Sequence, residues 1–319
     1  MNSKHQLVAD IGGTNARFAL CAEGSTKLKN VQVLDCKEYA SPVDAIEHYL
    51  ESTNVTLGAA CLAVAGPVKK AMDQVNMTNN PWFFSQSQLV QRFNLSRLVC
   101  VNDFVAAATA TTVIDSDALF FLSENNHFDR TQQRCILGPG TGLGVAAMLP
   151  HQGKTLVLST EGGNRSFAPE NELEDYIVHF LRSEIQPVSC EALLSGNGLV
   201  NIYRALCSRE QQTPDHSKPA TVSTAALEGD PMAQKTLQTF FEILGSVAGN
   251  CALTFGATGG VYIGGGIAPR FSEALSKSKF RERFESKLNY KHYLKKIPTA
   301  IVMHPYAGLL GAAAYLKDR

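Results

Sequence analysis

One sequence pattern occurs twice in the chain and limits the folds that it can adopt. Two β-rich apolar runs, at residues 6–10 and 16–22, flank the pair Gly12-Gly13, and two further runs, at 135–137 and 144–147, flank a second glycine-rich segment. Short apolar runs with glycines between them are typical of a β-hairpin. Two such units far apart in the sequence predict two related lobes that face a cleft.

Strands and helices alternate between the two units, which is typical of an α/β fold. A strand is predicted at 31–34 and a helix at 43–52, where apolar residues have helical spacing. The continuous apolar run at 59–65 predicts a strand that is buried on both faces. A further buried strand at 98–101 leads into a helix of small residues at 104–112.

Helical patterns dominate the second part of the chain. Asp230 and Pro231 supply an N-cap and a first-turn proline for the longest of these helices. The polar segment 206–222, which contains two prolines, is predicted to be an excursion on the surface. The strand at 261–263 ends in the glycines 264–266. The predicted helices span residues 171–184, 197–207 and 230 to about 254.

Length and charge exclude several classes of protein. With 319 residues, of which 45% are hydrophobic, the chain can form two compact lobes. Basic and acidic residues balance at 29 each, which argues against a nucleic-acid or membrane-surface partner. There is no apolar run of the roughly 20 residues that a membrane span needs. The eight cysteines are isolated from one another, which predicts buried thiols in a reducing cytoplasm and no structural zinc.

The first glycine unit, Asp10-Ile11-Gly12-Gly13-Thr14-Asn15, has two interpretations. Without side chains the backbone can present N–H groups to an anion at close range, as phosphate-binding loops do. Asp10 could then hold Mg²⁺ directly or through water. The same residues are also common in an ordinary tight hairpin turn. This loop alone does not decide between the two.

The second unit, Gly138-Pro139-Gly140-Thr141-Gly142-Leu143-Gly144, is unusually open and could bind phosphate oxygens through amide groups and the Thr141 hydroxyl. It also contains a loose G-x-G-x-x-A pattern, but a dinucleotide site needs a helix after the glycines, whereas 145–149 predicts a strand. Gly153-Lys154-Thr155 lacks the earlier glycine of a Walker A motif, because Met148 stands there. Both familiar nucleotide motifs therefore fail.

Five motifs occur along the chain: Asp10 to Arg17, Asn102-Asp103, Gly138 to Gly144, Glu161-Gly162-Gly163 and Val261 to Ile267. Together, in this order, they resemble those of bacterial glucokinases, members of the actin, hexokinase and Hsp70 superfamily. The resemblance spans about residues 7 to 316, and the absence of a cysteine-rich motif favours the zinc-free branch over the repressor-and-kinase sugar kinases. It implies an α/β, two-lobed actin-like ATPase (ribonuclease-H-like) fold with a small and a large domain around a cleft.

The resemblance also implies domain limits and a reaction. The small domain would be residues 1–113, the large domain 114–302, and 303–319 a C-terminal helix that returns to the small domain beside the helix after Asp103. The reaction would be ATP-dependent phosphorylation of glucose, with Asp103 accepting the proton of the attacking 6-hydroxyl. Read structurally, Asn102-Asp103 is equally a helix N-cap. ATP, Mg²⁺ and a homodimer are implied as well.

By the same resemblance, further residues bind substrate and nucleotide. The sugar contacts would be Asn102, Asp103, Glu161, Asn164 and Glu191, although Glu191 also fits the first turn of a helix capped by Ser189. Mg²⁺ would be held by Asp10. The nucleotide would be bound by Ala9, Asp10, Ile11, Gly12, Gly13, Thr14, Gly138, Gly140, Thr141, Gly142, Gly264, Gly265 and Gly266.

One position departs from the family pattern, which usually has histidine where this chain has Asn164. Asparagine donates and accepts hydrogen bonds but is shorter and never charged. A kinase for another hexose or related sugar therefore stays open beside glucose. A sugar-sensing protein without turnover is a third hypothesis, which the neutral charge and the lack of a helix-turn-helix segment disfavour.

Overall fold

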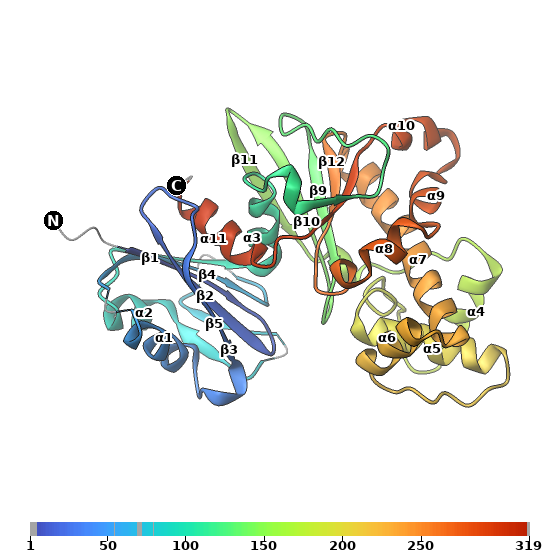
Figure 1. Ribbon diagram of the computed structural model, residues 1–319, viewed down its shortest axis with the longest axis horizontal. Helices are drawn as coiled ribbons and strands as arrows, with labels where there is room; N and C mark the ends of the chain where they lie inside the picture. Colours follow the sequence, from blue (N-terminus) through green and yellow to red (C-terminus); the bar gives the residue numbers. More distant parts are fainter. Residues whose placement is uncertain (1–4, 54, 69–71, 79, 318–319) are drawn as a thin grey trace. The chain divides into compact units, whose positions relative to one another are not determined.

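The structure, a computed structural model, describes residues 5–53, 55–68, 72–78 and 80–317. The chain divides into two compact units (Figure 1). Unit 1 consists of Met1–Ser116, His151–Ser159 and His304–Arg319, and unit 2 consists of Asp117–Pro150 and Thr160–Met303.

The sheet of unit 1 has five strands in the order β3-β2-β1-β4-β7. β1 and β2 form an antiparallel hairpin, and β1, β4 and β7 run parallel to one another. The predicted hairpin and strands are thus confirmed. The strands are β1 (His5–Ile11), β2 (Asn15–Ala22), β3 (Lys29–Asp35), β4 (Leu57–Val64) and β7 (Arg97–Asn102), beside a small two-stranded sheet of β5 (Gln74–Asn76) and β6 (Phe83–Ser85).

Helices cover both faces of this sheet (Figure 1). Alternate residues of β1 point to opposite sides, as the two-residue period of a strand requires. Leu7 packs in a cluster with α1 (Pro42–Glu51) and α2 (Gln86–Arg92), whereas Val8 packs in a cluster with α3 (Asp103–Ala110) and α11 (Ala307–Lys317). Asp10, two residues after Val8, therefore belongs to the face of α3 and α11.

The central and edge strands of the sheet differ in burial. All eight residues of β4 are buried, as its continuous apolar run predicted. The prediction of a buried strand at 98–101 was wrong in degree, because only Val101 of β7 is buried and the rest are half-buried. The reason is position: β7 is the last strand of the sheet and has a neighbour on one side only.

The second sheet has six strands in the order β11-β10-β9-β12-β13-β8. β9 and β10 form an antiparallel hairpin, and β12 lies parallel to both β9 and β13. The second predicted hairpin is thus confirmed. The strands are β8 (Leu119–Phe121), β9 (Arg134–Pro139), β10 (Leu143–His151), β11 (Lys154–Thr160), β12 (Gly260–Ile263) and β13 (Thr299–Val302).

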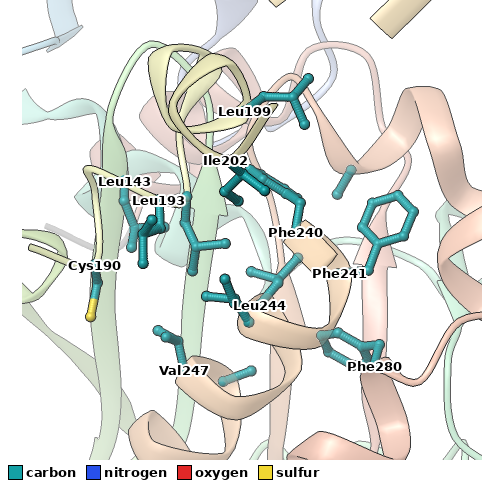
Figure 2. Packing of buried hydrophobic residues seen from close by; sticks show 14 of the residues in the cluster. Leu143, Cys190, Leu193, Leu199, Ile202, Phe240, Phe241, Leu244, Val247 and Phe280 are labelled. Carbon is teal, nitrogen blue, oxygen red and sulfur yellow. The ribbon is translucent and has the colours of Figure 1, made fainter. Parts of the chain in front are cut away.

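The core of unit 2 surrounds the long helix α7 (Pro231–Phe255). Its residues Phe240, Leu244 and Val247 lie among side chains of α5 (Gly196–Arg209) and of the strands (Figure 2). Asp230 is the N-cap of α7, accepting the N–H of Ala233, and Pro231 occupies the first turn as predicted. The other helices are α4 (Glu172–Leu181), α5 (Gly196–Arg209), α6 (Pro219–Glu228), α8 (Ser272–Ser276), α9 (Phe280–Glu285) and α10 (Lys291–Lys295).

The prediction of a surface excursion at 206–222 was wrong at both ends. α5 continues to Arg209, and α6 begins at Pro219, so that only 210–218 lies outside a helix. Proline is favoured in the first turn of a helix, where its missing N–H is not needed. Val222 then packs into the core.

All eight cysteines are unpaired, and all but Cys100 are buried. Burial raises the pKa of the Cys21 and Cys251 thiols to about 11, so that they stay protonated near neutral pH. In the described ranges, no helix is long and apolar enough to cross a membrane.

Candidate active site

The predicted site residues of unit 1 gather at one edge of its sheet. β1, β4 and β7 are parallel, and Ile11 lies opposite Val64, which in turn lies opposite Asn102. The carboxyl ends of the three strands therefore place the loop after Ile11 and the pair Asn102-Asp103 at the same edge. In open α/β sheets, this is the edge where ligands bind.

Asp10 is half-buried beside Arg17, whose Nη1 lies 3.2 Å from Asp10 Oδ2. Burial raises the pKa of Asp10, and the charge and hydrogen bond of Arg17 only partly oppose that effect. Gly308 of α11 leaves the room for this carboxyl, since a Cβ there would lie 2.5 Å from Asp10 Cγ. Gly308 was not among the predicted site residues.

The loop after Asp10 is a tight turn in which the Gly12 N–H donates to the Asn15 carbonyl at 2.9 Å. Asn80 Nδ2 donates to the Gly12 carbonyl at 3.2 Å and fixes the turn from outside. A Cβ at Gly12 would meet only the Asn15 oxygen at 3.6 Å, an ordinary contact, and Gly12 does not have a positive φ. The fold of unit 1 therefore does not itself require glycine at this position.

Asn102 is the N-cap of α3, as the structural interpretation of Asn102-Asp103 predicted. Its Oδ1 accepts the N–H of Phe104 at 2.9 Å, and its Nδ2 donates to the Gly66 carbonyl at 3.1 Å. Asp103 is the first residue of α3 and is half-buried, with Oδ1 2.9 Å from the same N–H. The N-terminus of a helix stabilises negative charge, which favours a carboxylate here.

In unit 2, the β9–β10 hairpin packs backbone to backbone against the turn 264–266. The Gly264 N–H donates to the Leu137 carbonyl at 2.8 Å. A Cβ at Gly138 would lie 2.5 Å from the carbonyl carbon of Gly264, and one at Gly265 would lie 2.3 Å from the Pro139 oxygen. Gly265 also has φ +78°, which glycine adopts readily. The structure thus brings the second and the last glycine motifs together.

The tip of this hairpin is held by its neighbours. The Gly140 N–H donates to the Gly142 carbonyl, and the Gly140 carbonyl accepts the N–H of Gly196 at the start of α5, both at 2.8 Å. Thr141 is exposed at the tip. A strand rather than a helix follows Gly144, and so the dinucleotide pattern fails here as the sequence indicated.

Glu191 contacts the same hairpin from another side. Its Oε2 accepts the N–H of Leu143 at 2.8 Å, and its own N–H donates to the Gly163 carbonyl at 2.9 Å. The alternative that placed Glu191 in the first turn of a helix capped by Ser189 is confirmed only in part. The Ser189 hydroxyl does accept the N–H of Ala192 at 3.2 Å, but it caps a turn, and α5 begins only at Gly196, with Ser195 as its N-cap.

Glu161 and Asn164 lie at the two ends of one short turn and are both exposed. Gly162–Asn164 is a 3-10 helix, and the Asn164 N–H donates to the Glu161 carbonyl at 3.0 Å. Gly163 packs directly on β10, since a Cβ there would lie 1.9 Å from the Leu143 oxygen. The three predicted sugar contacts of unit 2 are therefore joined through Gly163 and Leu143.

Comparison with known proteins decides the family. A family model described as Glucokinase matches residues 7–319. The chain is 42% identical over 319 residues to the glucokinase of Hahella chejuensis, with 99% of this chain and 98% of that protein covered. The chain belongs to the glucokinase family.

Solved structures show the same fold. Glucokinase from an Antarctic psychrotroph superposes with a TM-score of 0.88 at 37% identity and covers 99% of both chains. A ROK family glucokinase from Streptomyces griseus, solved with glucose and AMPPNP, has a TM-score of 0.66 at 19% identity, over 99% of this chain and 100% of that one. The predicted α/β, two-lobed actin-like fold is confirmed for this glucokinase-family chain.

Proposed function

We propose that this chain transfers the γ-phosphoryl group of ATP to the 6-hydroxyl of glucose. The observation that carries the proposal is the position of Asp103. In a chain of the glucokinase family, a half-buried carboxylate stands at the end of β7 and the start of α3, at the same sheet edge as the loop 10–15. A carboxylate within hydrogen-bond reach of an alcohol is the expected base and orienting group in phosphoryl transfer.

The sugar would be held by side chains that accept hydrogen bonds from hydroxyl groups. Asp103 accepts the proton of the 6-hydroxyl, and Glu161 and Glu191 accept from other hydroxyls. Asn102 adds a donor: an amide nitrogen carries two hydrogens, and the bond to Gly66 uses one of them. Asn164, exposed at the end of its turn, completes the set.

The phosphates of ATP would be bound by backbone N–H groups of the two hairpins. Glycine at position 12 is not required by the surrounding atoms, which favours close approach of a ligand as its purpose. The tip at Gly140, Thr141 and Gly142, of which Thr141 is exposed, supplies amide groups and a hydroxyl. Adenosine would lie against the turn 264–266, where side chains are absent. The full nucleotide set is Ala9 to Thr14, Gly138, Gly140, Thr141, Gly142, Gly264, Gly265 and Gly266.

Mg²⁺ bound to ATP would neutralise charge that develops on the phosphates. Within the described part of the chain, no group of three or more His, Cys, Asp and Glu side chains could hold a metal ion. Magnesium commonly uses one carboxylate together with phosphates and water, which a single residue can satisfy. Asp10 fits this role, since its carboxylate has about four lone-pair sites and Arg17 engages one.

The proposal extends to the setting of the enzyme. Unpaired cysteines and balanced charge support a cytoplasmic location, without nucleic-acid or membrane partners. A homodimer is proposed from the family resemblance. We also propose that the small domain is residues 1–113, the large domain 114–302, and 303–319 the helix that returns to the small domain.

A second candidate function is a kinase for another hexose, because Asn164 replaces the usual histidine in the sugar turn. A coupled assay of ADP release over a panel of hexoses separates the two. If glucose gives the highest kcat/KM, glucose is the substrate; if another sugar does, the alternative holds. ADP release that no sugar raises would exclude a sugar kinase altogether.

The role of Asp103 is tested by Asp103→Asn. Amides are not bases, so we expect kcat to fall by about 10²–10⁴-fold while the Kd for glucose, measured by calorimetry, changes little. Asp115→Asn is the matched control, because Asp115 is exposed in the same unit and has no proposed role. Comparable turnover in Asp103→Asn would remove Asp103 as the base.

A further inference from the structure

The Glu191 carboxylate makes a contact that sugar binding does not explain. Its Oε2 accepts the N–H of Leu143, the first residue of β10, at 2.8 Å. Leu143 directly follows the hairpin tip that we assign to the phosphates. A carboxylate that accepts a backbone N–H forms one of the stronger hydrogen bonds in proteins, because the acceptor is charged. Glu191 thus holds the base of the phosphate-binding hairpin.

The hairpin leaves room for this contact at one position. A Cβ at Gly142 would lie 2.5 Å from Glu191 Oε2 and 3.1 Å from Cδ, so that a side chain there would displace the carboxylate. Gly140, two residues earlier in the same tip, is different. A Cβ there would meet only the Gly266 nitrogen, at 3.9 Å. The absence of a side chain at Gly142 is therefore matched to Glu191.

The backbone that carries Glu191 is itself fixed. The N–H groups of Glu191 and Cys190 donate to the carbonyls of Gly163 and Arg165, both at 2.9 Å. The Arg165 guanidinium in turn donates to the Val247 carbonyl in α7 at 3.3 Å. Hydrogen bonds thus link the sugar turn 161–164, the segment of Glu191 and α7. The contact of Glu191 with Leu143 extends this fixed arrangement to the hairpin.

We propose that Glu191 is a positioning residue for the phosphate-binding hairpin, and that its carboxylate couples sugar binding to ATP binding. This rests on the proposed function, in which the sugar contacts Glu191 and phosphates contact the hairpin. A sugar hydroxyl on the carboxylate fixes the side chain that holds Leu143. ATP then binds a hairpin that is already ordered and loses less conformational entropy. By linkage, ATP strengthens sugar binding by the same factor.

The test is the Kd of AMPPNP, measured by calorimetry with and without saturating glucose. The ratio of the two values is the coupling factor, and we expect at least about 5-fold in the wild type, the lower end for coupled sites. Glu191→Ala should bring the factor close to 1. Glu161→Ala is the matched control: it removes the other proposed sugar carboxylate of unit 2 but leaves the contact with Leu143. It should weaken glucose binding yet keep the coupling factor once glucose saturates.

A second variant tests whether the position of the Glu191 carboxylate matters, and not only its presence. Gly142→Ala keeps Glu191 but displaces it, and should lower the coupling factor as Glu191→Ala does. A wild-type factor near 1, or an unchanged factor in Glu191→Ala, would overturn the proposal.

Hydrogen exchange of the ligand-free protein tests the contact itself, without sugar or turnover. Exchange of the Leu143 amide should rise in Glu191→Ala and not in Glu161→Ala; equal exchange in both would refute a positioning role. ADP release measured in parallel keeps the two proposals apart. Absence of glucose phosphorylation counts against the proposed function, whereas normal turnover with unaltered coupling and exchange counts against Glu191 as a positioning residue.

Discussion

The backbones of α3 and α11 cross so closely that a methyl group added at Gly311 should destabilise the protein. A Cβ added at Gly311 of α11 would lie 1.8 Å from the Ala106 carbonyl oxygen of α3 and 2.5 Å from its carbon. A carbon–oxygen contact needs about 3.3 Å, so the two backbones must separate by about 1.5 Å. Overpacking against backbone costs about 3 kcal/mol. Alanine is a better helix former than glycine by about 1 kcal/mol, so the net loss in the free energy of unfolding is about 2 kcal/mol.

Scanning calorimetry of Gly311→Ala should therefore show a fall in Tm of about 4–8 °C. The shift also displaces the start of α3, where Asp103 lies, and a misplacement of about 1 Å can lower kcat by about 10²-fold in an ADP-release assay. Gly266→Ala is the control for stability, because its Cβ would meet nothing within 4 Å. A Gly311→Ala protein as stable as the wild type, or more stable, would refute the steric argument, since helix propensity alone predicts a gain.

Two further predictions concern charge. Burial raises the pKa of Asp10 in the folded state. The protonated Asp10 carboxyl therefore contributes stability at low pH, and this contribution is lost as the pH rises through the folded pKa. Asp10→Asn should therefore raise the free energy of unfolding at pH 7, measured in urea, while abolishing most ADP release; a less stable variant would contradict this. Burial would raise the pKa of Glu170, but hydrogen bonds from Lys287 and Ser246 and the nearby positive charges together lower it. The stability that the ionised Glu170 contributes is present at neutral pH. It is lost as the pH falls through the folded pKa, which lies below the usual value of about 4.3. Lys287→Met should thus lose about 2 kcal/mol at pH 7, a figure reduced for the partial exposure of Glu170. The deficit should shrink in urea titrations toward pH 3, and a deficit that does not change with pH would exclude the ion pair as its cause.

The elements that the sequence predicted are those whose signals are local. Both hairpins follow from apolar runs around glycine, and α7 follows from Asp230-Pro231 before a periodic pattern. The burial of β7 was misjudged because its place at the sheet edge is a tertiary fact. α6 was missed because its polar surroundings concealed a helix that begins at a proline.

The candidate site likewise contains features that local sequence patterns indicate and contacts that they do not. Asn102 as an N-cap can be read from its place between a strand and a helix. In contrast, the contacts of Asn80 with Gly12 and of Gly308 with Asp10 join residues far apart in the sequence, and no local pattern indicates them. The same holds for the bond between Glu191 and Leu143, which neither of the two interpretations of Glu191 included.

In unit 2, the glycines proposed to bind the nucleotide and the residue Asn164 proposed to bind the sugar differ in the substitutions that the fold allows. Gly138 and Gly265 face backbone atoms at distances that admit no side chain, and a substitution there would break the packing of the sheet. Asn164 is exposed, and the bond between its N–H and the Glu161 carbonyl does not involve its side chain. Mutation can therefore sample new residues at position 164 without loss of folding. Over evolutionary time, sugar preference is free to drift while Gly138 and Gly265 stay fixed.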